Sequence, residues 1–205
     1  MNKKQKQGAL LVLIGLSMVF ASMFLHMIDR RQDQQAGENA AILLQQLELS
    51  RMSVPAATEM AQPEETVSDI VVIPEKEYLG FAMIGTLRIP SVGIELPIMR
   101  DWSYELLNVA PCRYSGSAPE GNMILMGHNY KSHFTPLHKI ATGAEVTFED
   151  VNGLQYRYCV DEIIFLHESK GKSLPSEYPL TLFTCTSGGQ SRVVVRCKAI
   201  EENEY

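Results

Sequence analysis

A cysteine and an arginine flank one short polar segment near the C-terminal end of the sequence. Two strand-like runs make up the stretch LTLFTCTSGGQSRVVVRC, residues 180–197, and TSGGQS separates them between Cys185 and Arg192. Paired glycines suit a tight reversal, so the stretch predicts an antiparallel hairpin in which Cys185 and Arg192 lie nearly opposite, with Cβ atoms about 5 Å apart. A nearby cation favours the nucleophilic thiolate, and a planar guanidinium can donate hydrogen bonds to a developing oxyanion.

A general acid or base is the next requirement, and the sequence has five histidines. His128 ends the predicted strand GNMILMGH, and a strand end is where a scaffold presents functional groups to a site. His26 lies in an apolar segment and His138 in an amphipathic connection, so we expect both to be surface or partly packed residues. His133 and His167 lie in loop-like sequence, where they can line a cleft although their spacing does not require it.

The elements that must position these residues read as short strands. Hydrophobic residues make up 45% and charged residues 20% of the 205 residues, as in an ordinary globular protein. From residue 78 onward, helical material is expected only in connections, such as residues 103–110 and 134–140. Seven or eight short strands without an internal repeat predict a small closed or nearly closed β-barrel. The strand-like segments are AMIGTLRIP, VGIELPIM, GNMILMGH, AEVTFED, LQYRYCVDEIIFL, LTLFTC and SRVVVRCKAI.

The N-terminal segment is apolar enough to span a membrane. Residues 8–27, GALLVLIGLSMVFASMFLHM, supply the roughly 20 apolar residues that a bilayer requires, and three lysines precede them. A cleavable signal peptide is the alternative, because Val19 and Ala21 offer a small-residue pattern. Both interpretations place residues 29–205 outside the cytoplasm. In the anchored interpretation, the protein is a single-pass membrane protein with its N-terminus inside.

The chain divides into three parts on composition. Residues 1–28 form the cytoplasmic end and the transmembrane anchor. Residues 29–77 read as a stalk, in which residues 38–52 favour a short amphipathic helix, and the rest is rich in Pro, Glu, Ser and Thr. Residues 78–205 are expected to form the catalytic domain.

Charge and cysteine content narrow the function classes. A net charge of -6 argues against a nucleic-acid partner, since such proteins present a basic surface to phosphates. Three of the four cysteines, Cys159, Cys185 and Cys197, fall in strand-like runs, where a free cysteine often packs as a small hydrophobe. Cys112, Cys159 and Cys197 are interpreted as packed thiols, and the even number of cysteines does not by itself imply disulfides.

Three motifs together resemble the sortases, the membrane-anchored cysteine transpeptidases of Gram-positive bacteria. They are TLFTC with Arg192 seven residues after its cysteine, the segment GNMILMGHNYKSHFTPLHKI with His128, and IGTLRIPSVGIELPI at residues 84–98. The resemblance covers residues 78–200 and implies a closed eight-stranded sortase-like barrel. It also implies that His128, Cys185 and Arg192 form a catalytic triad, with Thr184, the residue before the nucleophile, at the substrate-binding site.

The resemblance carries expectations about the reaction and its partners. Cys185 is expected to attack a C-terminal sorting signal of LPxTG type on a surface or pilin protein and to form a thioacyl enzyme. An amine from a peptidoglycan precursor or a pilin lysine then takes the acyl group. Residues 167–179 fall where the family has a substrate-recognition loop. No cofactor is expected, although some family members bind calcium, and Glu145, Glu149, Asp150 and Asp161 show no ligand spacing that favours it.

Two other functions stay open on the sequence alone. One is an extracytoplasmic cysteine hydrolase that releases its substrate to water. The other is a non-enzymatic β-domain that binds a component of the cell wall. The identity of the acyl acceptor, amine or water, distinguishes a transpeptidase from a hydrolase. An unreactive thiol favours the non-enzymatic binding domain.

Overall fold

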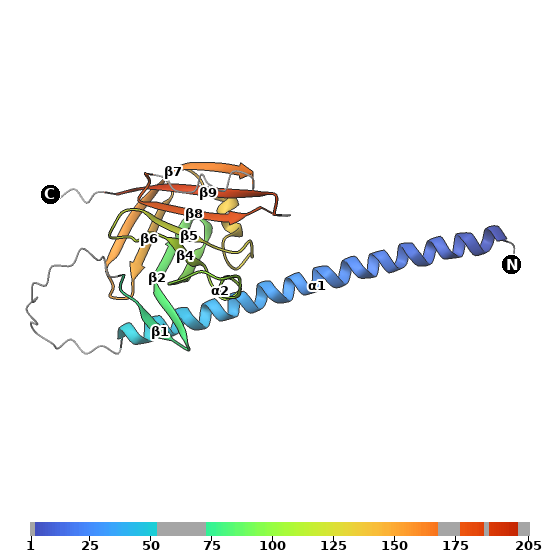
Figure 1. Ribbon diagram of the computed structural model, residues 1–205, viewed down its shortest axis with the longest axis horizontal. Coiled ribbons are helices and arrows are strands. Elements are labelled where there is room, and N and C mark those ends of the chain that lie inside the picture. The colour runs from blue at the N-terminus through green and yellow to red at the C-terminus, as the bar shows by residue number, and fades with distance from the viewer. Residues whose placement is uncertain (1–2, 53–72, 168–176, 187–188, 201–205) are drawn as a thin grey trace, which may run out of the picture.

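A β-barrel and one long helix make up the structure, a computed structural model that describes residues 3–52, 73–167, 177–186 and 189–200 (Figure 1). Part of the expected stalk, residues 53–72, lies outside the described residues. The same holds for residues 168–176 of the expected substrate-recognition loop and for turn residues 187 and 188.

Eight strands close the barrel. The strand order is β2-β3-β4-β5-β8-β9-β7-β6, and β6 pairs with β2 to complete the circle, while β1 adds an outer edge next to β2. The closed eight-stranded barrel that we expected is confirmed. The strands are β1 Lys76–Tyr78, β2 Phe81–Ile89, β3 Ile94–Met99, β4 Cys112–Ser115, β5 Met123–Met126, β6 Glu145–Asp150, β7 Gln155–His167, β8 Leu180–Cys185 and β9 Ser191–Ala199.

Helices outside α1 are short connections, as the sequence predicts. Residues 103–110 contain α2, Tyr104–Leu107, whose first turn is capped because the Ser103 hydroxyl accepts a hydrogen bond from Leu106 N. Residues 134–140 contain the 3-10 helix η2, Thr135–Lys139, and a second 3-10 helix, η1, spans Pro90–Val92. These connections leave the strand ends to position the candidate site.

The inside of the barrel is filled by inward-facing apolar side chains from all around the sheet. Successive side chains of a strand point to opposite faces of the sheet, so every second residue faces the core. In β8 these residues are Leu180 and Leu182, and in β9 they are Val193 and Val195. A second, smaller cluster lies on the outer face, where Phe183 packs with Ile124 and Val194. The core therefore fixes the register of β8 and β9 and, with it, the positions of their ends.

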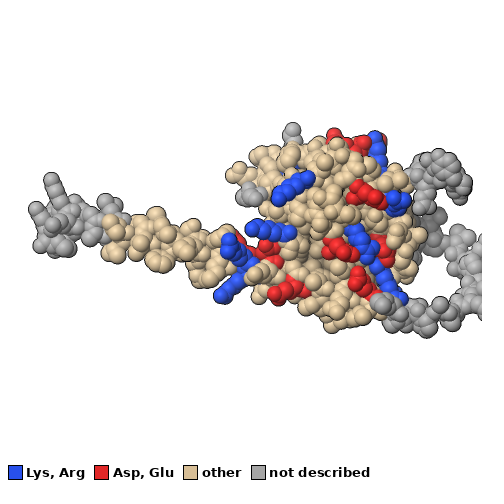
Figure 2. Space-filling model, turned by 180° about the vertical axis from the view of Figure 1, so that it is seen from behind, with Lys and Arg blue, Asp and Glu red and all other residues tan. Residues whose placement is uncertain are grey.

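The helix α1, Lys3–Met52, is continuous and has two dissimilar parts. Side chains between Val12 and Ile28 are exposed, and the helix is long and apolar enough to cross a membrane. Figure 2 shows the tan stretch of this protruding part without charged side chains up to the point where it meets the barrel. Residues 38–52, where a short amphipathic helix was expected, form the opposite end of the same helix.

That C-terminal part of α1 packs against the barrel. Leu43 and Leu47 are buried in a cluster with Met83, Met99 and Cys112, among others. Arg51 forms an ion pair with Glu149 at 2.6 Å and donates a hydrogen bond to the backbone oxygen of Asp150. This part of α1, which belongs to the expected stalk at residues 29–77, thus shares a buried cluster with the barrel.

Candidate active site

The hairpin of β8 and β9 holds Cys185 and Arg192 opposite each other. Antiparallel register pairs Cys185 with Arg192, and Thr186 N donates a hydrogen bond of 2.7 Å to Ser191 O just beyond this pair. Cys185 is exposed at the strand end, as a nucleophile must be. The arrangement that the sequence predicts for these two residues is present in the structure.

Arg192 is held by an aromatic ring and retains its hydrogen-bonding capacity. Its guanidinium carbon lies 5.8 Å from the centroid of the Phe183 ring, within the range of a cation–π interaction. Among the described residues, Arg192 forms no salt bridge. The planar donors of this side chain are therefore available to a bound carbonyl oxygen.

His128 lies at the same end of the sheet as Cys185 because β5 and β8 run parallel in register. Met126 pairs with Phe183, and Gly127 N donates to Phe183 O at 3.1 Å, which continues the pairing by one residue. His128 and Cys185 each follow this pair by two residues, so they lie at the ends of adjacent strands that are about 4.8 Å apart. Burial lowers the pKa of His128, which favours the neutral imidazole that a general base requires.

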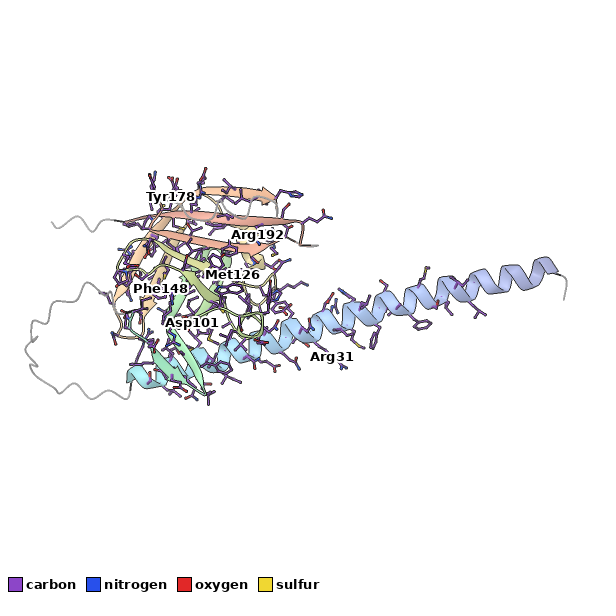
Figure 3. The ribbon with its side chains drawn as sticks, in the orientation of Figure 1. Arg31, Asp101, Met126, Phe148, Tyr178 and Arg192 are labelled. Carbon is purple, nitrogen blue, oxygen red and sulfur yellow. The ribbon has the colours of Figure 1, made fainter. Side chains whose placement is uncertain are left out.

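One pocket of about 860 Å³ contains all four predicted site residues in its wall, namely His128, Thr184, Cys185 and Arg192. This size is in the range of binding sites for drug-sized ligands. Figure 3 shows Arg192 at the end of the barrel that faces the protruding part of α1. The pocket is therefore located at that end, on the outer surface of the sheet.

Thr184 differs from its neighbours in burial. It is 1% exposed, and its hydroxyl has no hydrogen-bond partner among the described residues. Strand alternation directs it to the opposite face from Phe183 and Cys185. Thr184 thus contributes a buried polar group directly behind the candidate nucleophile.

The aromatic part of the pocket was not identified from the sequence. Trp102 packs on Tyr104 and on Tyr114, with ring centroids 6.0 and 5.7 Å apart, and Tyr114 meets the edge of Phe183 at 5.4 Å. These rings form a row that runs from the loop before α2, across β4, to the Phe183 ring, against which Arg192 lies. One signal was present, because Phe183 lies two residues before Cys185 in a strand and therefore shares its face.

The helix α1 supplies another wall that the sequence did not predict. His26, Asp29, Arg30 and Asp33 line the same pocket as Cys185. Sequence spacing gives no signal for this contact, because these residues are about 150 positions from the nucleophile. The end of the apolar segment of α1 is thus next to the candidate site.

The remaining cysteines and histidines lie where packing or exposure explains them. All four cysteines are free thiols, and burial raises the pKa of Cys112 and of Cys197 to about 12. His133 is buried beneath α1, and His138 is exposed on η2. His167 ends β7, next to residues outside the described part of the chain.

The carboxylates considered for calcium have other partners. Glu145 pairs with Arg157, Glu149 with Arg51 and Arg88, and Asp161 with Lys198. The Asp150 carboxylate accepts hydrogen bonds from Asn152 N and Leu154 N. Within the described residues, no group of three His, Cys, Asp or Glu side chains is arranged to hold a metal ion.

Comparisons with known proteins agree on one family. A sequence model of the sortase domain matches residues 87–200, more than half of the chain. A search of curated proteins finds no match. Among solved structures, Streptococcus agalactiae sortase C1 in complex with MTSET is 26% identical, with a TM-score of 0.52 over 60% of this chain and 72% of that chain.

Two further sortases have the same fold at lower identity. Streptococcus suis sortase C1 is 22% identical over 60% of this chain and 76% of its own, with a TM-score of 0.52. A sortase D5 transpeptidase from Clostridium perfringens is also 22% identical, over 58% of this chain and 79% of its own, with a TM-score of 0.52. Sortase C1 and sortase D5 structures match this chain with the same TM-score, so the comparison does not assign a sortase class. The domain match, together with this shared barrel, shows that the chain belongs to the sortase family, whose members are in general membrane-anchored cysteine transpeptidases.

Proposed function

We propose that the chain is a sortase-type transpeptidase in which Cys185 is the nucleophile. The Cys185 thiolate attacks the backbone carbonyl carbon of a sorting signal, and the C–N bond of the tetrahedral intermediate breaks to leave a thioester. His128 takes the thiol proton of Cys185 as the thiolate forms and gives this proton to the departing amine. In the second half-reaction, His128 removes a proton from the incoming amine, which attacks the thioester and releases the Cys185 thiolate.

Arg192 and Thr184 have supporting roles in this proposal. Arg192 donates planar hydrogen bonds to the carbonyl oxygen as negative charge develops on it, and it orients the peptide. Thr184 contributes to substrate binding from the pocket wall behind the nucleophile. A Thr184→Val variant keeps the shape of the side chain and removes its hydroxyl, so we expect it to raise KM more than it lowers kcat.

The observation that carries the proposal is the pairing of β8 with two neighbouring strands, β9 and β5, at one end of the sheet. Antiparallel pairing places Arg192 opposite Cys185, and parallel pairing brings the end of β5, with His128, beside the end of β8. A nucleophile, a proton-transfer group and a fixed cation thus meet in one pocket. These three groups supply all the chemistry of the proposed acyl transfer, so we propose that the reaction needs no cofactor. Measurement of activity in excess EDTA tests this proposal, and activity should persist.

We propose that the substrate is an extended LPxTG-like signal near the C-terminus of a surface or pilin protein, with an amine of a peptidoglycan precursor or a pilin as acceptor. The family supports this class of partner. The row of aromatic rings along the outer face gives the pocket an apolar side against which proline and leucine side chains can pack.

We further propose that α1 crosses the cell membrane with its N-terminus inside and that the pocket opens at the outer membrane surface. His26 and Asp29 line the pocket at the point where the apolar segment of α1 ends. Trp102, the single tryptophan of the chain, lines it too. In vesicles that contain the full-length protein, brominated lipids should quench Trp102 fluorescence, whereas unquenched fluorescence contradicts this placement.

A peptide screen tests the reaction itself. The full-length protein is incubated with a library of pentapeptide sorting signals, with and without an amine acceptor, and both protein and peptide products are weighed by mass spectrometry. We expect an acyl adduct on Cys185 and an amide product when the amine is present. An acid product in the presence of excess amine supports a hydrolase instead, and the absence of an adduct with every signal contradicts the proposal.

A further inference from the structure

The loop that carries His128 is a compact unit. Phe134 N donates to His128 O at 3.3 Å, and His133 N and Thr135 N both donate to Tyr130 O, at 3.0 and 3.1 Å. Gly127 permits the close approach of the loop ends, because a Cβ atom at this position would lie 2.4 Å from the Phe134 ring. The segment from Gly127 to Thr135 therefore folds back on itself, and its parts move together.

Tyr130 determines how the His128 ring lies. The two rings are stacked, with centroids 4.4 Å apart and planes inclined by 14°. The Tyr130 hydroxyl donates a hydrogen bond of 2.8 Å to Asn108 Oδ1, which fixes the far edge of the phenol ring. Burial raises the pKa of Tyr130, and the carboxylates of Asp33 and Asp29 raise it further, so the hydroxyl keeps the proton that it donates.

The helix α1 holds this loop through one side chain. Asp33 Oδ1 accepts hydrogen bonds from Ser132 N at 3.0 Å and from Ser132 Oγ at 2.8 Å. The same hydroxyl lies 2.9 Å from Asp33 O. Asp33 and Ser132 are 99 residues apart in the chain, so this contact joins the two elements only in the folded protein.

Small residues let the helix come this close. A Cβ atom at Gly37, one turn after Asp33, would lie 3.0 Å from Ser132 Cβ. Next to Gly37, Ala36 is fully buried, and its backbone lies against the His133 ring, which is 1% exposed. Asp33, Ala36 and Gly37 thus form the surface of α1 on which the loop rests.

We propose that Asp33 is a positioning residue for the reaction, which holds the 127–135 loop and thereby the plane of the His128 ring. The inference rests on the proposed role of His128. The orientation of His128 matters because one imidazole must serve two amines in turn, and displacement of a reacting group by about 1 Å can cost on the order of 100-fold in rate. Asp33 acts through Ser132 and Tyr130 and makes no contact with the reacting atoms.

Three α1 variants of the full-length protein test the role, with the most active pentapeptide of the screen as substrate. Asp33→Ala removes both acceptor contacts of the side chain, so we expect kcat to fall about 10-fold with KM within twofold of the original. Asp33→Asn retains an oxygen that accepts from Ser132 N and Oγ, and we expect it to restore kcat to within about threefold. Glu38→Ala is the matched control and should leave both constants unchanged. Glu38 is an exposed acidic residue of the same helix, and among the described residues it forms no salt bridge.

Leu47→Ala separates positioning from simple helix docking. Leu47 is buried against the barrel away from the loop, and its truncation should lower the melting temperature more than Asp33→Ala does while kcat stays within about twofold. If kcat instead follows the melting temperature across Leu47→Ala, Asp33→Ala and Asp33→Asn, the positioning role is wrong.

His128→Ala distinguishes this inference from the proposed function. An active His128→Ala variant refutes the role of His128 and the inference with it. An inactive His128→Ala variant together with an Asp33→Ala variant of unchanged kcat refutes the positioning role alone.

Discussion

The two walls of the candidate pocket are built in different ways. Cys185 and Arg192 lie on one hairpin, seven residues apart, and their juxtaposition follows from the pairing of two adjacent strands. His128 lies on a loop whose shape depends on a helix from the other end of the chain, through Asp33 and Ser132. One wall is thus local and regular, whereas the other is assembled from distant segments.

Because the two walls are held by different contacts, substitutions should affect them in different ways. The hairpin is anchored in the barrel core by Leu182, Val193 and Val195, so its geometry should tolerate changes elsewhere on the surface. The loop has few regular strand contacts and is held by single hydrogen bonds and stacked rings. Substitutions in the hairpin should therefore act on the chemistry directly, and substitutions around the loop should act through geometry.

Removal of the nucleophile should have the largest effect. Cys185→Ala leaves the strand pairing intact and prevents formation of a thioester, so transpeptidation should fall to background with an unchanged circular dichroism spectrum. Intact-mass analysis with the peptide should show no adduct. Replacement of Cys112, Cys159 and Cys197 together is the control, and measurable activity in that triple variant is expected. An adduct that persists in Cys185→Ala contradicts the assignment.

Arg192→Lys tests whether the hairpin supplies only charge. Lysine keeps the positive charge but loses the planar fork, so we expect kcat/KM to fall on the order of 100-fold, comparable with the loss of one oxyanion donor. Steady-state kinetics with the best pentapeptide measures this. Full activity in Arg192→Lys together with inactivity in Arg192→Ala means that charge alone suffices.

The local wall could be predicted from the sequence, and its prediction depended on patterns of a few residues. Alternating apolar residues in residues 180–197 and the glycines between Cys185 and Arg192 specify a hairpin and its register. Seven strand-like segments correspond to seven barrel strands. The eighth, β4, spans Cys112–Ser115, and its sequence CRYS has no apolar run, whereas the equally short β5 consists of the apolar residues MILM.

The assembled wall could not be predicted in the same way. Composition separated residues 29–77 from the barrel, yet Ala36, Ala40, Leu43 and Leu47 form a buried stripe on α1 at helical spacing. Such a stripe indicates that a helix has a partner but does not identify the partner. Stacking of Tyr130 on His128 and the contact of Asp33 with Ser132 depend on tertiary packing, for which a single sequence gives no periodic signal.

Acid should weaken the assembled wall before it affects the hairpin. Burial lowers the pKa of His133 to about 4 in the folded protein. As the pH falls below about 6.5, the His133 imidazole therefore binds a proton in the unfolded chain before it does so in the folded protein. The free energy of unfolding should be greatest above pH 6.5 and should decrease by about 3 kcal/mol between pH 6.5 and 4. Urea unfolding of the full-length protein in detergent at several pH values measures the loss. His133→Gln should remove most of this slope, and an unchanged slope in the variant contradicts the assignment.

The smallest effect is expected from Tyr130→Phe, which separates the two contacts of this ring. Phenylalanine can still stack on His128 but cannot donate to Asn108, and the lost hydrogen bond is exposed to solvent. An exposed neutral hydrogen bond contributes about 1 kcal/mol or less, so kcat should fall no more than about fivefold. Tyr130→Leu loses the stacked ring as well and should reduce kcat further, toward the level of Asp33→Ala. If Tyr130→Phe is instead as damaging as Arg192→Lys, the hydroxyl takes part in the reaction itself, and the loop wall contributes chemistry as well as geometry.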